Sequence, residues 1–134
     1  MQDLAVLTPQ NNMIMDTNNK TVYPTATPSM SKKRADLAPD QVEAFRNFSK
    51  TVFKAGAIDE KTKQLIAVAV AHVTQCPYCI KGHTKLAKQK GATNNEIMEA
   101  IWVASEMRAG AAYAHAALAV EEMEIAEEKQ EDLQ

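Results

Sequence analysis

The stretch of sequence that decides the fold joins two long helical patterns and reads Gln75-Cys76-Pro77-Tyr78-Cys79-Ile80-Lys81-Gly82-His83. It contains both cysteines of the chain and one of the three histidines. Pro77 suits the first turn of a helix, because the backbone N–H that proline lacks would have no partner there. We therefore expect a helix from Pro77 to residue 89 or 90, ended by Gly91, with Cys76 at its N-cap and Cys79 in its first turn.

The segment before this stretch predicts a buried helix. Asp59 is a suitable N-cap, and the residues from Leu65 to Val73 are almost all apolar. Their β-branched content alone would also allow a buried strand. The length from Asp59 to Thr74, the alanine content and the cap favour a central helix.

Further helices are expected on both sides. An amphipathic helix from about Pro39 to Ala55 should supply most of the aromatic packing, through an apolar face made of Val42, Phe45, Phe48, Val52 and Phe53. Thr93 and Glu96 form a capping box that opens another helix, with an apolar face made of Ile97, Ala100, Ile101 and Ala104. We expect Gly110 to break or kink that helix, and a last helix to follow through Tyr113, Leu118 and Met123. The fold class is all-α, a bundle of about five to six helices.

One domain is expected between two irregular ends. Residues 1–34 are predicted to be an irregular arm, since Pro24, Pro28 and clusters of asparagine interrupt regular structure. The helical domain should span residues 35–128, and residues 129–134 should form a frayed, charged tail. Aromatic residues make up only 5% of the chain and alanine supplies much of the apolar content, so we expect the core to be completed by oligomerisation.

Charge and hydropathy exclude several classes of function. The formal net charge is −2, from 15 basic and 17 acidic residues, so we expect no binding to nucleic acid or to an anionic membrane. No apolar run is long enough to span a bilayer, and no secretory signal is recognised. The expected compartment is cytoplasmic, where a cysteine pair is more often catalytic or metal-binding than structural.

The Cys-x-x-Cys pair predicts thiol chemistry. The unpaired N–H groups at a helix start favour thiolate over thiol, and His83 lies one helical turn after Cys79. The imidazole would therefore be placed to bond the Cys79 sulfur or to carry its proton. One cysteine could attack a substrate and the other could then close a disulfide.

Other interpretations of the same residues remain open at this point. Cys76, Cys79 and His83 could be three ligands of a metal ion, with His72 or His115 as a fourth, although structural zinc usually has a second ligand pair. Two buried structural thiols are a further alternative. Cys-Pro-Tyr-Cys is also the glutaredoxin motif, but that fold requires strands around the motif, where this chain has helical patterns.

From about Leu37 to Val120 the sequence resembles the carboxymuconolactone decarboxylase-like family, specifically its alkylhydroperoxidase (AhpD-like) branch. The residues that carry the resemblance are Gly56-Ala57-Ile58-Asp59-Glu60-Lys61-Thr62-Lys63-Gln64-Leu65-Ile66, then Cys76-Pro77-Tyr78-Cys79 with His83, and then Gly91-Ala92-Thr93, Glu96-Ile97 and Ala100. Decarboxylase members lack the cysteine pair, so the pair indicates the redox branch.

The resemblance implies an all-α oligomer, a trimer or a hexamer with the hexamer favoured, that reduces hydroperoxides through a dithiol–disulfide cycle. It implies that Cys79 attacks the peroxide, that Cys76 donates a proton and then resolves the sulfenic acid, and that His83 belongs to a proton relay. The reductant would be a thiol-carrying protein, either lipoylated or thioredoxin-like, and no cofactor is needed. The alternatives on this fold are a non-peroxidatic protein, either metal-binding or purely structural, and a decarboxylase- or isomerase-like enzyme.

The chain departs from the family pattern in the relay. Gln64 occupies the position where the resemblance implies a glutamate, and an amide cannot accept a proton as a carboxylate does. Glu60, one turn earlier, is a possible substitute, although a solvated first-turn glutamate is its simpler role. Tyr78 stands where some relatives carry a histidine, and His72 is placed to approach the site from the preceding helix.

Overall fold

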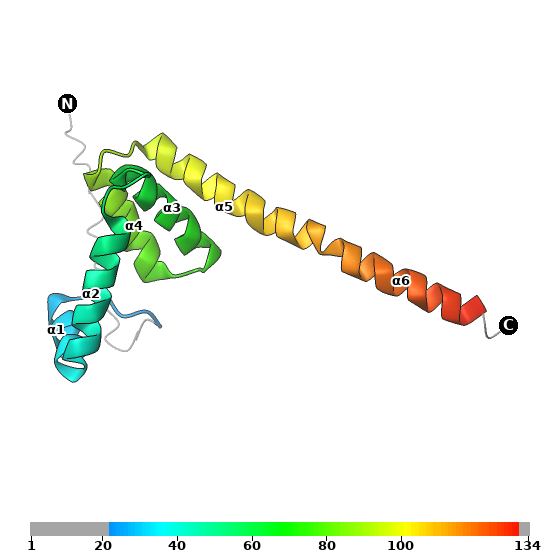
Figure 1. Ribbon diagram of the computed structural model, residues 1–134, viewed down its shortest axis with the longest axis horizontal. Coiled ribbons are helices and arrows are strands. Elements are labelled where there is room, and N and C mark those ends of the chain that lie inside the picture. The colour runs from blue at the N-terminus through cyan, green and yellow to red at the C-terminus, as the bar shows by residue number, and fades with distance from the viewer. Residues whose placement is uncertain (1–21, 132–134) are drawn as a thin grey trace, which may run out of the picture.

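The structure is a computed structural model that describes residues 22–131 of the chain. Six helices and no strand are found in this part of the chain (Figure 1), in the order α1 (Pro28–Leu37), α2 (Pro39–Phe53), α3 (Glu60–Val73), α4 (Pro77–Gln89), α5 (Asn94–Ala114) and α6 (Ala116–Glu131). The predicted all-α class is therefore confirmed, and none of these helices is long and apolar enough to cross a membrane.

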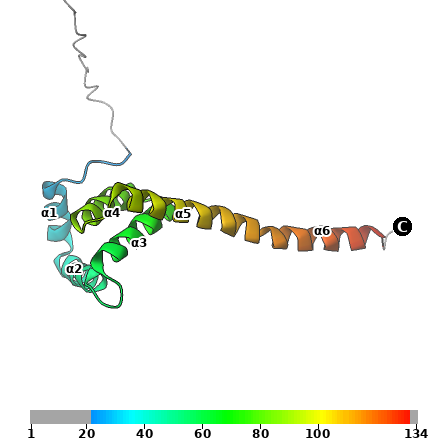
Figure 2. The same ribbon diagram turned by 90° about the horizontal axis from the view of Figure 1, so that it is seen from above.

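The centre of the fold is α3, which packs against both α4 and α5 (Figure 2). The buried apolar side chains come from these three helices and the turn between α4 and α5, and they are Val68, Ala71, Ala87, Ala92, Ile97 and Ala104. Most of them are alanines, so the three helices approach closely while each buries only a small apolar area. This core fixes the positions of α3 and α4, the two helices that carry the predicted site.

The local signals in the sequence act as predicted. The Asp59 carboxylate accepts a hydrogen bond of 2.9 Å from the Thr62 N–H at the start of α3. Both hydrogen bonds of the Thr93–Glu96 capping box are present at the start of α5. Gly91 adopts a φ of 86°, a left-handed conformation that suits glycine after a helix. Each helix of the core thus begins or ends where its own sequence directs it.

The predicted irregular arm is wrong for residues 28–34, which belong to α1. The Thr27 hydroxyl accepts a hydrogen bond of 3.2 Å from the Met30 N–H, and Pro28 occupies the first helical turn. The proline that suggested an interruption therefore begins a helix. Residues 1–21 of the predicted arm lie outside the described part of the chain.

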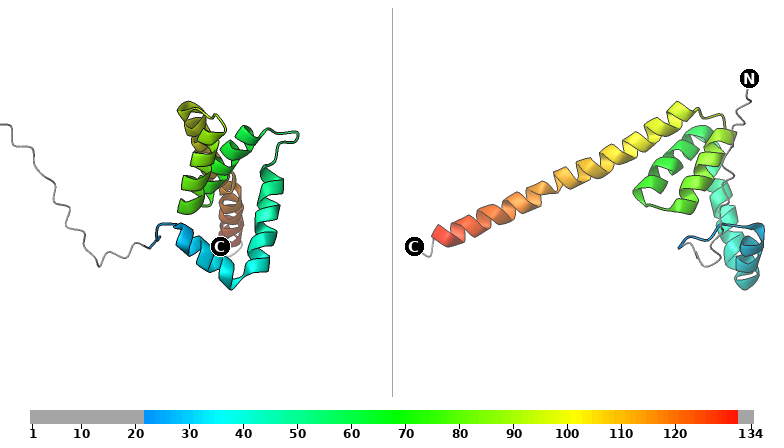
Figure 3. Two further views of the ribbon diagram at one scale, coloured as in Figure 1. Left: turned by 90° about the vertical axis from the view of Figure 1, so that its left-hand side faces the viewer. Right: turned by 180° about the vertical axis from the view of Figure 1, so that it is seen from behind.

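The aromatic face of α2 does not form the core that the sequence predicted. Phe45 and Phe48 remain 68% and 64% exposed, and their ring centroids lie 6.3 Å apart. Figure 3 shows α1 and α2 as a V that stands beside α3 and α4. The ammonium group of Lys63 in α3 joins the end of α2 to the bundle, because it donates to the carbonyls of Val52 and Lys54 at 2.7 and 2.6 Å.

The predicted break at Gly110 is also wrong, because α5 continues through it to Ala114. A glycine inside a helix costs only about 1 kcal/mol of helix stability relative to alanine. The high helix propensity of the surrounding alanines offsets that cost. The interruption falls at His115, and α6 then runs almost in line with α5 as a long rod (Figure 1). Because α6 extends to Glu131, residues 129–131 of the predicted frayed tail are helical.

Candidate active site

The two cysteines meet at the N-terminus of α4, as predicted. Cys76 is the N-cap residue, and its sulfur accepts a hydrogen bond of 3.3 Å from the backbone N–H of Cys79. Both thiols are free and both residues are half-buried. The sulfur of Cys76 thus takes the place of the hydroxyl or carboxylate oxygen that normally caps a helix.

This geometry gives the two thiols opposite electrostatics. Hydrogen bonds from the Cys79 thiol and then from its backbone N–H lower the pKa of Cys76. The same contact raises the pKa of Cys79, because its thiol hydrogen is used in the bond to Cys76, and burial adds to the rise. Of the two thiols, Cys76 is therefore the one that ionises first, and the proton of the pair then stays on Cys79.

His83 is bound to Gln64 of α3. The ring Nδ1 lies 2.8 Å from the Gln64 amide oxygen, and the Gln64 residue is only 5% exposed. An amide oxygen can only accept, so Nδ1 carries the hydrogen and Nε2 of the neutral ring keeps a free lone pair. Burial lowers the pKa of His83, which favours this neutral form near pH 7.

Sequence reasoning missed the surroundings of His83. The Phe53 ring from α2 stacks on the imidazole, with the ring centroids 5.1 Å apart. An open hollow of about 550 Å³ lies beside them, and its lining residues are Val52, Phe53, Lys63, Ile66, Ala67, Val70 and His83. The Lys63 ammonium is already bound to the backbone carbonyls at the end of α2. Apart from Lys63 and His83, the residues that line the hollow are apolar. The helical spacing of apolar residues in α2 placed Phe53 on the apolar face of that helix. It could not show that the Phe53 ring would stack on His83.

The other predicted site residues lie in different contacts. Glu60 forms an ion pair with Lys90 near the far end of α4. His72 Nδ1 lies 2.7 Å from the Val68 carbonyl of its own helix. The predicted bond between His83 and Cys79 is not found within residues 22–131, where the ring instead bonds Gln64.

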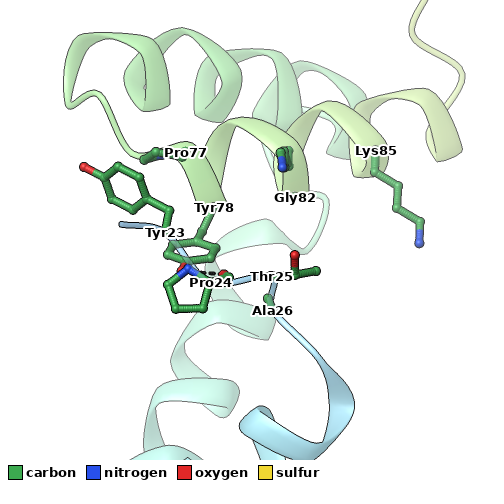
Figure 4. A pocket seen from close by; sticks show the side chains of 9 residues that line it. Tyr23, Pro24, Thr25, Ala26, Pro77, Tyr78, Gly82 and Lys85 are labelled. Carbon is green, nitrogen blue, oxygen red and sulfur yellow. Dashed lines mark hydrogen bonds between the residues drawn. The ribbon is translucent and has the colours of Figure 1, made fainter. Parts of the chain in front are cut away.

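Tyr78, between the two cysteines, faces the chain that precedes α1. Its hydroxyl donates a hydrogen bond of 2.7 Å to the Pro24 carbonyl, and its ring meets the Tyr23 ring edge-on (Figure 4). This residue therefore holds the N-terminal segment and does not reach the His83 side of the site. In the described part of the chain, no group of three histidine, cysteine or acidic side chains is arranged as metal ligands would be.

The structure defines a class of protein, an all-α scaffold with a dithiol at the N-terminus of α4. Comparison with known proteins identifies the family. Residues 39–122 match the model of the carboxymuconolactone decarboxylase family, and the chain belongs to that family. A curated relative, uncharacterized protein 4 in the cox locus of Paracoccus denitrificans, is 72% identical over 80 residues, which are 58% of this chain and 72% of the relative.

Solved structures agree with this assignment. A carboxymuconolactone decarboxylase family protein from Legionella pneumophila is 34% identical with a TM-score of 0.57, over 59% of this chain and 70% of that one. A protein from Methanobacterium thermoautotrophicum is 32% identical with a TM-score of 0.63, over 67% of this chain and 98% of that one.

Proposed function

We propose that this protein is a thiol-dependent hydroperoxide reductase of the alkylhydroperoxidase (AhpD-like) branch of its family. The observation that carries the proposal is the cysteine pair at the start of α4, where the Cys79 N–H bonds the Cys76 sulfur. Two thiols that share one proton can perform both halves of a peroxidase cycle, attack and resolution. A catalytic cysteine pair is typical of proteins in a reducing compartment, which favours the cytoplasm.

The first half of the cycle forms a sulfenic acid. As Cys79 attacks the outer peroxide oxygen, its proton passes to the Cys76 thiolate and from there to the departing alkoxide. The O–O bond breaks, Cys79 becomes a sulfenic acid and one alcohol leaves. This route uses the Cys76 thiolate as a base and assigns attack to Cys79, as the family resemblance implies.

The second half closes the disulfide. The Cys76 thiolate attacks the Cys79 sulfenic acid and displaces hydroxide, which leaves as water after gaining a proton. A thiol-carrying protein then returns two electrons and two protons to the pair. Neutral His83 takes up a proton from solvent at Nε2 and passes it to the departing hydroxide, with Gln64 holding the ring in that tautomer.

A peroxide-consumption assay tests the proposal. We expect the purified protein to consume cumene hydroperoxide over many turnovers with dithiothreitol or a thioredoxin system as reductant. One equivalent of peroxide should convert Cys76 and Cys79 into a disulfide, detected by mass spectrometry as the loss of two hydrogens. If no thiol donor gives consumption above the uncatalysed rate, the proposed function is wrong.

We also propose that the protein assembles from copies of itself, as a trimer or a hexamer. Along α5, Ile97 and Ala104 are buried against the bundle. Ala111, Leu118 and Ile125 continue the same stripe at intervals of seven residues, where α5 and α6 extend beyond the core. Leu118 is 63% exposed in the single chain, so a second copy would complete the burial of this stripe.

Light scattering coupled to size-exclusion chromatography tests the assembly. We expect a mass of three or six times 14.7 kDa for the wild type, and a large shift toward the monomer for Leu118→Asp. Gln130→Asp, which adds the same charge at an exposed polar position of α6, should leave the mass unchanged. A wild-type monomer would contradict the proposal.

A further inference from the structure

A second hollow lies on the opposite side of α4 from His83, between that helix and the segment before α1. Its volume is about 330 Å³, and the lining residues are Tyr23, Pro24, Thr25, Ala26, Pro77, Tyr78, Lys81, Gly82 and Lys85. Figure 4 shows Tyr23 and Pro24 beside the Tyr78 ring, with Lys85 further along the helix. The lining residues of α4 follow one another at helical spacing, and Cys79 and His83 lie on a different face.

This hollow presents positive charge next to the dithiol. Lys81 and Lys85 are exposed, and neither ammonium group has a carboxylate partner within residues 22–131. Other lysines nearby are already engaged, since Lys61 pairs with Glu96 and Lys90 with Glu60. Two unpaired cations beside an exposed tyrosine favour a partner that carries acidic groups.

Gly82 is one of the residues that line this hollow. It lies inside α4, where glycine stabilises a helix less than alanine does. A Cβ added at Gly82 would meet nothing within 4 Å, so packing within this chain does not require glycine there. The missing side chain instead leaves the floor of the hollow open.

We propose that the thiol-carrying electron donor docks on the Tyr78–Lys81–Lys85 face of α4 through an acidic segment that flanks its own thiol. The inference rests on the proposed function, because a donor is needed only if the dithiol turns over. Lys81 and Lys85 lie about 7 and 14 Å along the helix axis from Cys76, at about 1.5 Å per residue. An extended acidic segment of about two to four residues, at roughly 3.4 Å per residue, spans that distance and brings the donor thiol to the disulfide.

The electron transfer is ordinary thiol–disulfide exchange. A donor thiolate attacks one sulfur of the Cys76–Cys79 disulfide, and the other cysteine leaves as a thiolate that takes up a proton. A second donor thiol attacks the donor sulfur of the mixed disulfide and releases the remaining cysteine. Two donor thiols are oxidised to one disulfide, and the protein gains two electrons and two protons.

The test uses protein oxidised with diamide and two matched cysteine peptides, one flanked by glutamates and one by glutamines. Reduction of the Cys76–Cys79 disulfide is followed by mass spectrometry in the absence of peroxide. At low ionic strength we expect the acidic peptide to reduce the wild type at least about fivefold faster than the neutral peptide. In 1 M salt, where screening acts over about 3 Å, the difference should disappear.

Variants locate the effect on α4. Lys81→Gln with Lys85→Gln should remove the preference for the acidic peptide, whereas Lys129→Gln, near the end of α6, should keep it. Gly82→Leu, which fills the hollow at a position with free space, should slow both peptides. Peroxide consumption with dithiothreitol should remain unchanged in all of these variants.

Two results would overturn the docking proposal: equal rates for the two peptides on the wild type, or an unchanged preference in the double lysine variant. Neither result depends on peroxidase activity. A clear preference for the acidic peptide in a protein that consumes no peroxide would support the docking site and refute the proposed function.

Discussion

Replacing Cys79 with serine is expected to reduce peroxide consumption by at least about a thousandfold, since the variant loses the sulfur nucleophile of the proposed cycle. A serine hydroxyl is not oxidised by peroxide, so neither a sulfenic acid at position 79 nor the Cys76–Cys79 disulfide can form. Fold and assembly should be preserved, because Cys79 is only half-buried and serine is similar in size. The measurement is the rate of cumene hydroperoxide loss with dithiothreitol, compared with wild type at equal protein concentration.

Cys76→Ser is the matched variant, and we expect it to react with peroxide once but not to close the disulfide. The attacking cysteine remains, so without any thiol reductant we expect about one equivalent of peroxide to be consumed and a sulfenic acid to persist, trapped by dimedone and located at Cys79 by mass spectrometry. The first turnover should also be slower, because the thiolate that accepts the Cys79 proton is absent.

Because the pKa of Cys76 is lowered and that of Cys79 is raised, the same two variants can also give the opposite result, in which Cys76 attacks the peroxide. If Cys79→Ser forms the trapped sulfenic acid at Cys76 and Cys76→Ser consumes nothing, attack belongs to Cys76, whose pKa is lowered by the hydrogen bonds from the thiol and the backbone N–H of Cys79. The assignment of Cys79 as nucleophile would then be wrong, although the dithiol cycle would stand.

Gln64→Glu is expected to increase peroxide turnover by about tenfold, which is a fraction of the roughly 10²- to 10⁴-fold that general acid–base catalysis contributes in full. The Gln64 amide oxygen lies 2.8 Å from His83 Nδ1, so a carboxylate introduced there would stabilise the imidazolium and raise the pKa of His83. A more basic ring accepts a proton more readily, which accelerates a relay that depends on Nε2. The rate is measured from peroxide loss, and the pKa of His83 from the NMR titration of its ring protons.

The pH profile distinguishes this effect from a general change in the protein. Activity that needs neutral His83 falls as the pH drops through the pKa of the ring. In the wild type, burial lowers that pKa below its ordinary value, so the fall begins at lower pH than for an exposed histidine. In Gln64→Glu the fall should begin at higher pH, although the rate above it is greater.

Two control variants complete the test. Gln64→Met retains the shape of the side chain without the hydrogen bond, and we expect lower activity than wild type because the ring tautomer is no longer fixed. In the background of His83→Gln, Gln64→Glu should have no accelerating effect. An equal acceleration with and without His83 would show that the relay does not pass through this pair.

The sequence predicted those features of the fold that depend on interactions between residues close together in the chain. Asp59, Pro77 and the Thr93–Glu96 pair direct backbone groups within four residues of themselves, and the helices they begin were predicted correctly. The sequence predicted that Phe45 would pack in the core and that Gly110 would break its helix, and both predictions were wrong. The exposure of Phe45 and the continuation of α5 through Gly110 depend on which helices pack together. An apolar stripe shows that a face is to be buried but does not say what will bury it.

By itself the sequence determined the all-α class, the helix start at Pro77 and the meeting of Cys76 with Cys79, because all of these follow from contacts within one helical turn. Only the tertiary structure decided the partner of His83. The sequence placed it one turn from Cys79, but the packing of α3 against α4 brings it to Gln64, 19 residues earlier in the chain. The tertiary structure also decided that Tyr78 binds Pro24, 54 residues away. As a result, Tyr78 and His83 lie on two separate faces of α4. Such contacts depend on how helices cross, and no local pattern records that geometry.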